Sequence, residues 1–457
     1  MKSFRRARFT PQLPNWTTLR AFGTSDYRWL WGENFAISSA RFSIILISGW
    51  VSYSFTNSVI GSSVVAFLGF APPLLFGPFI GMLADKLDKR LLIKVGAGLG
   101  AAVSLLAFAA SMLGKFDLAL SLALALTAGV SFTLEAPSRT SLIPTIIGEN
   151  GGLLNAYSWI RVAAQGSEFV GPAITTLLLV TYGATFALLI PLLMYGLSLF
   201  QTFMIKTRSE MASNKKGVPN TLKSITEEPI RETTSIATSD IHTVNTETVG
   251  TQTKSSELFK GFAYIRSEKT ISVLILLVGL HCSLTMAYTG LLPSFSVSSL
   301  KGGDSVYGIL LTAVGLGAIV WSVGLARYAH RVNENQILVI TAVLSGATLS
   351  LLALTSSPVF AYITAFFVGG SQAMFMTLIQ SSTQSLSKAE MRGRVAGLSF
   401  FFTAGVMGFS GLAQGFLALE IGTQLVMIVT GLVFVAIVVA MVQRLRNLKI
   451  RYSETLE

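Results

Sequence analysis

Four ionisable side chains interrupt the long apolar segments of this sequence, and each can carry charge or a proton. They are Glu33, Arg41, Arg161 and Glu168. A charge at mid-depth in a membrane costs about 2.5 to 3.5 kcal/mol, so it usually faces a partner or a water-filled path. Arg41 and Glu168 lie nearest the middle of their segments. We therefore expect them to form an ion pair, with Glu168 as the proton-carrying group.

Glu33 and Arg161 lie closer to the ends of their segments, and for Glu33 the simplest expectation is a side chain that reaches the lipid headgroups. Arg161, Gln165 and Glu168 follow helical spacing, i, i+4 and i+7, so one helix face carries a polar stripe. In an apolar solvent such a stripe belongs against protein or water.

Three further polar residues are candidates for substrate binding or coupling. His281 titrates near neutral pH when unperturbed and can relay protons, although a lone histidine in an apolar helix is more often a packing residue. Asn34 and Gln372 either face the transport path or form hydrogen bonds between helices, and the sequence does not separate these readings.

Composition excludes several classes of chemistry. Of the 457 residues, 51% are apolar and 12% are charged, whereas a soluble domain carries about 25% charged residues. The single cysteine and three widely separated histidines do not suggest a metal or redox site. No phosphate-binding loop of the Gly-x4-Gly-Lys-Ser/Thr type is present, and the charges in apolar segments are too scattered for a membrane-embedded enzyme. We expect no cofactor and no catalytic residue.

Apolar segments of about 20 residues predict membrane-spanning helices, so the expected fold class is an all-α membrane protein with twelve transmembrane helices. The predicted spans are 28–52, 58–80, 91–113, 117–135, 156–180, 183–205, 270–292, 305–326, 335–355, 358–380, 396–418 and 423–443. Prolines 72, 73 and 78 predict a bend in the second span.

The spans divide the chain into two six-helix bundles, residues 28–205 and 270–443, between the tails 1–27 and 444–457. The Ser/Thr-rich segment 206–269 predicts a flexible linker that ends in an amphipathic helix at the membrane surface. A solvated connection to the seventh span is the alternative.

Most of the 34 Lys and Arg residues lie on one side of this arrangement, which places both termini in the cytoplasm. The net charge of +12 then reflects topology, and nucleic acid is not expected as a partner.

The two halves share sequence. Thr133-Leu134 and Ser141-Leu142 in the first half match Thr377-Leu378 and Ser385-Leu386 in the second at a constant offset. Parallel six-helix repeats are a transporter arrangement, with the substrate site between the halves near the middle of the membrane.

The segment GMLADKLDKRLLI, residues 81–93, follows the second span. It resembles the cytoplasmic signature of the major facilitator superfamily, Gly-x-Leu-Ala-Asp-x-x-Gly-Arg-Arg, with Asp88 and Lys89 as departures. The segments EAPSRTSLIPTIIGENGGLLNAYSW, SELFKGFAYIRSEKT and SKAEMRGRVAGL are similar to the bacterial efflux branch that contains macrolide and enterobactin exporters. The Arg-x-x-Gln-Gly motif of proton-coupled antiporters is missing from the fourth span.

This resemblance implies alternating access and a set of gating residues, Gly81, Asp85, Lys89, Arg90, Glu135 and Arg394. We expect Asp85 to cap the start of the eleventh span near Arg394, and Arg90 to pair with Glu135.

The function expected from these features is the export of a hydrophobic or amphipathic small molecule (a drug, a macrolide or a siderophore-like compound) by a monomer in the bacterial cytoplasmic membrane. The coupling ion is expected to be the proton, as in an antiporter. An importer or facilitator of a small nutrient on the same fold is the main alternative, and a non-transporting membrane sensor is a second.

The linker gives a first testable prediction. Deletion of residues 212–252 should leave transport unchanged, because no apolar or charged pattern there can hold a fixed structure. Transport and surface expression of the deletion variant check this. A deleted protein that reaches the membrane but is inactive would contradict it.

Overall fold

The computed structural model describes residues 21–77, 80, 87–148, 153–207, 263–328, 334–388, 391, 395, 399 and 401–446. Within these ranges the chain is helical and contains no strand. Most of the predicted linker lies outside the described residues. Ile265, near its end, is buried and packs with Ile271, Ile275 and Val395.

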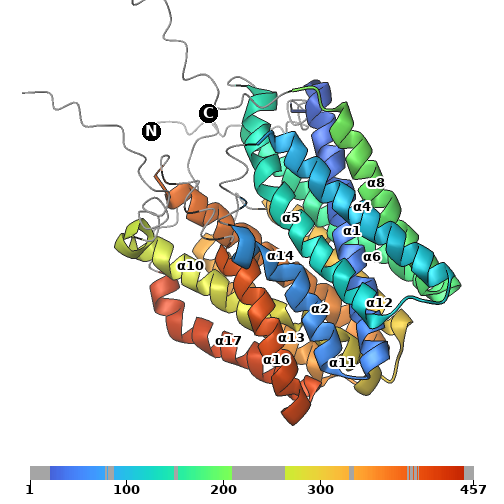
Figure 1. The fold of residues 1–457 in the computed structure, drawn as a ribbon. Helices are drawn as coiled ribbons and strands as arrows, with labels where there is room; N and C mark the ends of the chain where they lie inside the picture. The colour runs from blue at the N-terminus through green and yellow to red at the C-terminus, as the bar shows by residue number, and fades with distance from the viewer. Residues whose placement is uncertain are drawn as a thin grey trace, which may run out of the picture.

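Two sets of helices form two bundles (Figure 1). The first consists of α1 (Ser25–Thr56), α2 (Val59–Phe70), α4 (Lys89–Met112), α5 (Leu118–Ile147), α6 (Leu153–Tyr182), α7 (Ala184–Ala187) and α8 (Leu189–Met204). The second consists of α10 (Lys269–His281), η3 (Cys282–Met286), η4 (Ala287–Gly290), α11 (Leu292–Ser298), α12 (Asp304–Tyr328), α13 (Glu334–Leu354), α14 (Pro358–Leu386), η7 (Phe401–Gly405), α16 (Val406–Ile421) and α17 (Thr423–Arg446).

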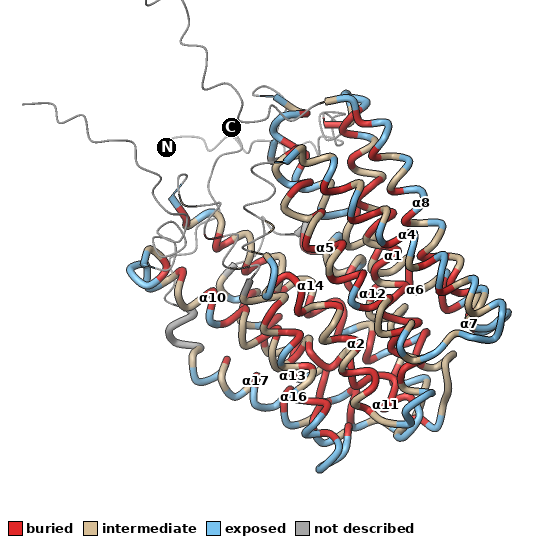
Figure 2. Tube along the Cα trace, in the orientation of Figure 1, coloured by how far each residue is buried: buried red, intermediate tan, exposed pale blue. Residues whose placement is uncertain are grey.

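The predicted fold class is confirmed. Eleven spans of the described chain are long and apolar enough to cross a membrane. Helix α6, which carries the polar stripe, has 30 residues and supplies the twelfth. The chain is therefore a multi-pass membrane protein. Buried residues follow the helix faces that point between neighbours (Figure 2), and large apolar side chains such as Leu106, Val323 and Phe360 are exposed on the outside, where lipid would lie.

The fourth span is longer than predicted. We expected it to end at residue 135, before Pro137, but α5 continues to Ile147 with Pro137 and Pro144 inside the helix. Pro144 has no N–H to donate to the carbonyl of Thr140. The Tyr157 hydroxyl donates to that carbonyl instead, at 3.1 Å. A side chain from α6 thus replaces a missing backbone hydrogen bond.

The second span bends as its prolines predict. Helix α2 ends at Phe70, and residues 72–77 form a further helical segment after a bend at Ala71. Pro72 and Pro73 cannot donate to the carbonyls of Leu68 and Gly69, which leaves those two oxygens open to other donors.

The seventh span is interrupted by a π-helical turn and a 3-10 turn between Cys282 and Gly290, a break that the sequence did not predict. Two glutamines support it. The Gln372 amide donates to the carbonyl of Thr285 at 2.6 Å, and the Gln414 amide donates to the carbonyl of Ser283 at 2.8 Å. Gln372 is therefore a hydrogen-bonding link between helices, which was one of its two expected roles.

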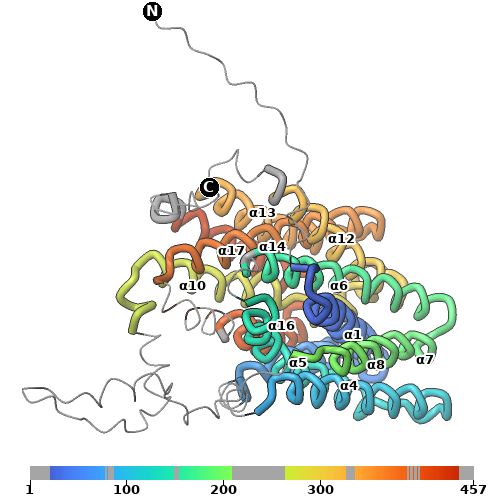
Figure 3. The backbone as a smooth tube through the Cα atoms, turned by 90° about the horizontal axis from the view of Figure 1, so that it is seen from above, coloured from blue at the N-terminus to red at the C-terminus, as the bar shows by residue number. Residues whose placement is uncertain are grey.

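The bundles meet along two pairs of helices. One pair is α6 with α12 (Figure 3), and the other is α2 with α16. The end of the molecule where α1 begins also carries Lys89 and Arg90, and we call it the basic end. We call the other end the opposite end. Near the opposite end the Ser62 hydroxyl donates to the carbonyl of Gly290 at 2.6 Å, and Trp50 stacks on Tyr307.

Glycines allow the backbones of the two bundles to approach closely. A Cβ added at Gly315 of α12 would lie 2.6 Å from the Phe169 Cα of α6, and one added at Gly408 of α16 would lie 3.1 Å from the Ala71 nitrogen. The first of these contacts cannot accommodate a methyl group unless the helices separate.

Substitution of Gly315 therefore tests the contact between the bundles. In a background with Gln165→Cys and Ser322→Cys, a short thiol cross-linker should join α6 to α12, and Gly315→Ala should reduce the yield several-fold. Gly324→Ala on the same helix is the matched control, because a Cβ there meets nothing within 4 Å. Equal yields from the two variants would contradict this packing.

Candidate functional site

The first feature of the site is a buried ion pair that links α1 to α5. Arg139 Nε donates to Glu33 Oε2 at 2.8 Å, and Arg139 Nη2 donates to Glu33 Oε1 at 3.1 Å. The Glu33 side chain is 0% exposed and that of Arg139 is 6% exposed. The expectation that Glu33 reaches the headgroups is therefore wrong. Helix α5 continues past Pro137, and this continuation carries Arg139 into the bundle.

Glu135 lies one helical turn from Arg139 and shares it with Glu33. Its Oε2 is 3.7 Å from Arg139 Nη2, and its Oε1 has no hydrogen-bond partner. A Cβ at Gly96 would lie 2.5 Å from that oxygen, so the carboxyl group packs directly against the α4 backbone. Two carboxyl groups thus share one guanidinium in a buried site.

The predicted pair between Arg90 and Glu135 is not formed. Arg90 pairs with Asp88 at 3.2 Å and donates to the carbonyl of Ile205 at 2.9 Å. The reason is local. Asp88 is the N-cap of α4 and accepts a hydrogen bond from the Arg90 N–H at 3.0 Å, which keeps both side chains at the start of the helix.

The other gating residues are only partly described. Lys89 donates to the carbonyl of Ser141 at 3.1 Å, so it links the start of α4 to α5. Gly81, Asp85 and Arg394 lie outside the described residues, and their expected roles stay predictions.

Arg41 is buried in the first bundle, but it does not form the predicted ion pair with Glu168. Its Nη2 donates to the carbonyl of Gly69 at 3.3 Å, an oxygen that Pro73 leaves without its helical donor. Its guanidinium also lies 3.8 Å from the Phe132 ring centroid and 4.8 Å from that of Phe70. Aromatic faces and a free carbonyl are favourable partners for a desolvated cation.

The polar stripe of α6 faces the second bundle, as expected of polar side chains in an apolar solvent. Gln165 Nε2 donates to Ser322 Oγ of α12 at 2.9 Å. Glu168 is partly exposed and Arg161 is exposed. Neither forms an ion pair with any residue in the described part of the chain. Glu168 is therefore a partly exposed acid at the contact between the bundles.

Asn34 and His281 take up structural positions. The Asn34 amide donates to the carbonyl of Ile160 at 2.8 Å and links α1 to α6. His281 is fully buried in the second bundle, where Nε2 interacts with Ser345 Oγ at 2.9 Å and the ring lies 4.3 Å from Phe375. Its surroundings match those of a packing residue.

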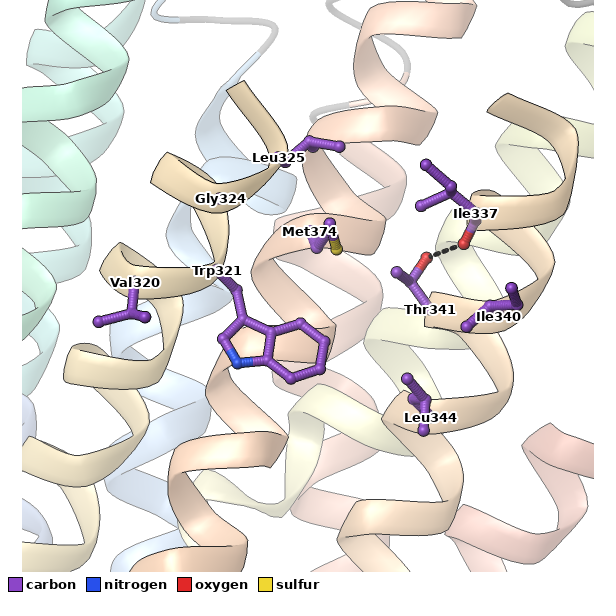
Figure 4. Close-up of a pocket in the computed structure, with 9 residues that line it drawn as sticks. All are labelled: Val320, Trp321, Gly324, Leu325, Ile337, Ile340, Thr341, Leu344 and Met374. Carbon is purple, nitrogen blue, oxygen red and sulfur yellow. Dashed lines mark hydrogen bonds between the residues drawn. The ribbon is translucent and has the colours of Figure 1, made fainter. Parts of the chain in front are cut away.

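A cavity of about 440 Å³ lies within the second bundle, away from these charges (Figure 4). Its lining comes from α12, α13 and α14: Val320, Trp321, Gly324, Leu325, Ile337, Ile340, Thr341, Leu344 and Met374. The Thr341 hydroxyl donates to the carbonyl of Ile337, and Ile340 is exposed on the outer surface. Because the cavity borders one bundle only, it does not fit a site that must open alternately to both sides of a membrane.

Arg139 is the functional residue that sequence reasoning missed. A fourth span that ends before Pro137 puts Arg139 in a loop, whereas the helix in fact continues through the proline. One signal was available, because Arg139 follows Glu135 at i+4, which is the spacing of an ion pair on one helix face.

Comparison with known proteins places this arrangement in a wider group. The family model of the Major Facilitator Superfamily matches residues 34–412 and again 277–454. The second match lies in the C-terminal half, in keeping with the repeat. A search of curated proteins found no match.

Solved structures of transporters share the fold. A POT family transporter in complex with a thioalcohol-conjugated peptide is 13% identical, with a TM-score of 0.64 over 92% of this chain and 97% of that chain. A mutant of the nucleoside transporter NupG is 13% identical, with a TM-score of 0.62 over 92% of this chain and 100% of that chain. At these identities the likeness concerns the fold alone.

The buried ion pair gives a stability prediction. Arg139→Ala leaves the Glu33 carboxylate without its partner in a buried site, which should cost about 3 to 5 kcal/mol and lower the melting temperature in detergent. Arg90→Ala removes a partly exposed pair and should cost about 1 kcal/mol or less. The melting temperatures of both variants, measured by size-exclusion chromatography after heating, make the comparison. Equal stability would show that Arg139 is not needed in the buried site.

Proposed function

The chain belongs to the Major Facilitator Superfamily, and from this we propose that it exports a hydrophobic or amphipathic small molecule in exchange for protons. The proposal rests on the position and surroundings of Glu168. It is an acid within a membrane-spanning helix, on the face packed against the other bundle, partly exposed and without an ion pair among the described residues.

Glu168 has the properties that coupling requires. A carboxyl group that binds a proton in one state and releases it in another must have access to water and an environment that changes. Arg41 and Arg161 both act electrostatically on Glu168 without forming a direct pair with it. When the bundles move relative to one another, the balance between desolvation and these two cations changes, and protonation changes with it.

The proposed substrate class rests on the residues that face across the contact between the bundles. Aromatic pairs bridge it at two levels. Trp50 and Tyr307 stack with ring centroids 6.2 Å apart, and Phe67 and Phe409 meet edge to face at 5.0 Å. Aromatic surfaces of this kind favour apolar or amphipathic molecules, with a few polar groups to orient them.

The proposed direction is export, and it rests on the likeness to the efflux branch. The proposed location of both termini, in the cytoplasm of a bacterial cell, rests on the distribution of basic residues. An importer or facilitator of a nutrient is the alternative on this fold, and the structural neighbours include a peptide transporter and a nucleoside transporter by name. A non-transporting sensor would bind ligand without moving it.

Accumulation of labelled compounds separates these functions. Cells that express the protein should retain less of a lipophilic cationic dye and of a macrolide than cells without it. Higher retention would indicate an importer, and unchanged retention of both probes would contradict the proposed substrate class.

Substitution of Glu168 tests the coupling role in the same assay. Glu168→Gln should abolish uphill export, so that retention rises to the level of cells without the protein, while downhill exchange persists. Glu168→Asp should keep part of the activity. Glu420→Gln, at an exposed acid near the end of α16, is the matched control and should export as the wild type does. Full uphill export by Glu168→Gln would contradict the assignment.

A further inference from the structure

Glu135 is a buried acid that the proposed transport cycle does not yet use. Its side chain is 1% exposed. One carboxyl oxygen has no hydrogen-bond partner, and the other reaches only the distant edge of the Arg139 guanidinium, at 3.7 Å. An unpartnered, ionised carboxylate oxygen in a dry site is costly, whereas a neutral carboxyl group is far less so.

The charges around Glu135 can be counted helix by helix. Helix α1 brings Glu33 and Arg41, α5 brings Arg139, and α8 brings the Tyr195 phenol. The described part of α2 contains no ionisable residue, and α4 presents Gly96. Arg139 is already engaged in two short hydrogen bonds with Glu33.

Arg41 does not form an ion pair with Glu135 that would neutralise a carboxylate there. Its guanidinium donates to the Gly69 carbonyl and lies against aromatic rings, and its Nε has no partner. The pair formed by Glu33 and Arg139 is electrically neutral, so an ionised Glu135 would leave only an indirect interaction with Arg41 to offset its charge.

We propose that Glu135 is a second proton-binding site of this protein, which holds a proton in the conformation described here. The proton resides on the Glu135 carboxyl group, which is then neutral beside the pair of Glu33 and Arg139. On release the proton passes to water, and the carboxylate takes up a closer contact with Arg139 or with the free Nε of Arg41. No covalent bond other than O–H is made or broken.

This site deepens the proposed function, on which its transport role rests, because it would add a second proton to the cycle. It also explains why α4 has glycine at residue 96. The Cβ of any other residue there would lie 2.5 Å from Glu135 Oε1 and displace the carboxyl group from its place between α4 and α5.

Infrared spectroscopy of the purified protein tests the proposal without a substrate. A protonated buried carboxyl group gives a C=O stretching band that carboxylates lack, and the band shifts in heavy water. We expect this band at neutral pH in the wild type, its loss in Glu135→Gln, and its retention in Glu168→Gln. Glu135→Asp should keep a shifted band, which shows that the loss in Glu135→Gln is not due to misfolding.

The outcomes separate the two proton sites. Absence of the band from the wild type, or an unchanged band in Glu135→Gln, would overturn the second site and leave Glu168 as the only proposed carrier. Loss of the band in Glu135→Gln together with full coupled export by Glu168→Gln would support the second site and refute the role of Glu168.

Discussion

A membrane offers no water to satisfy a charge or a backbone carbonyl, so the helices of this protein must satisfy these groups among themselves. Several departures from regular helix are met by a side chain from another helix. The Tyr157 hydroxyl meets the carbonyl freed by Pro144, Arg41 meets the one freed by Pro73, and Gln372 supports the break in the seventh span. Arg139 meets Glu33 for the same reason. These contacts hold each bundle together from within.

The three glutamates in the described helices of the first bundle differ in a way that matters for function. Glu33 accepts two charge-assisted hydrogen bonds from Arg139, at 2.8 and 3.1 Å. Glu135 and Glu168 lack such contacts, one in a dry interior and the other at the contact with the second bundle. When the bundles of a transporter move, the surroundings of such acids change. A change of conformation can therefore alter the proton affinity of acids that lack complete hydrogen bonding.

Much of the fold was predictable from the sequence, because apolar segments of sufficient length can only be transmembrane helices. The twelve spans, the bend in the second span and the family all followed from local patterns. The site was less accessible. The partner of Glu33 lies 106 residues away, and the carbonyl that binds Arg41 becomes free only because of a proline on another helix. Such pairings depend on packing between helices, which no local pattern records. Arg41 and Glu168 have opposite charges and similar positions along their helices, and the sequence therefore predicted an ion pair between them. That pair does not form.

We infer that the bundles move as two bodies under the control of protonation, so that one end opens as the other closes. Distances between spin labels on α6 and α12 test it most directly. One pair, Leu153→Cys at the start of α6 and Val323→Cys on α12, reports on the basic end, and the other, Tyr182→Cys at the end of α6 and Lys301→Cys just before α12, reports on the opposite end. A change of pH should move the two distances in opposite directions, and this response should be lost in Glu168→Gln. Distances that do not respond to pH, or that change together at both ends, would contradict it.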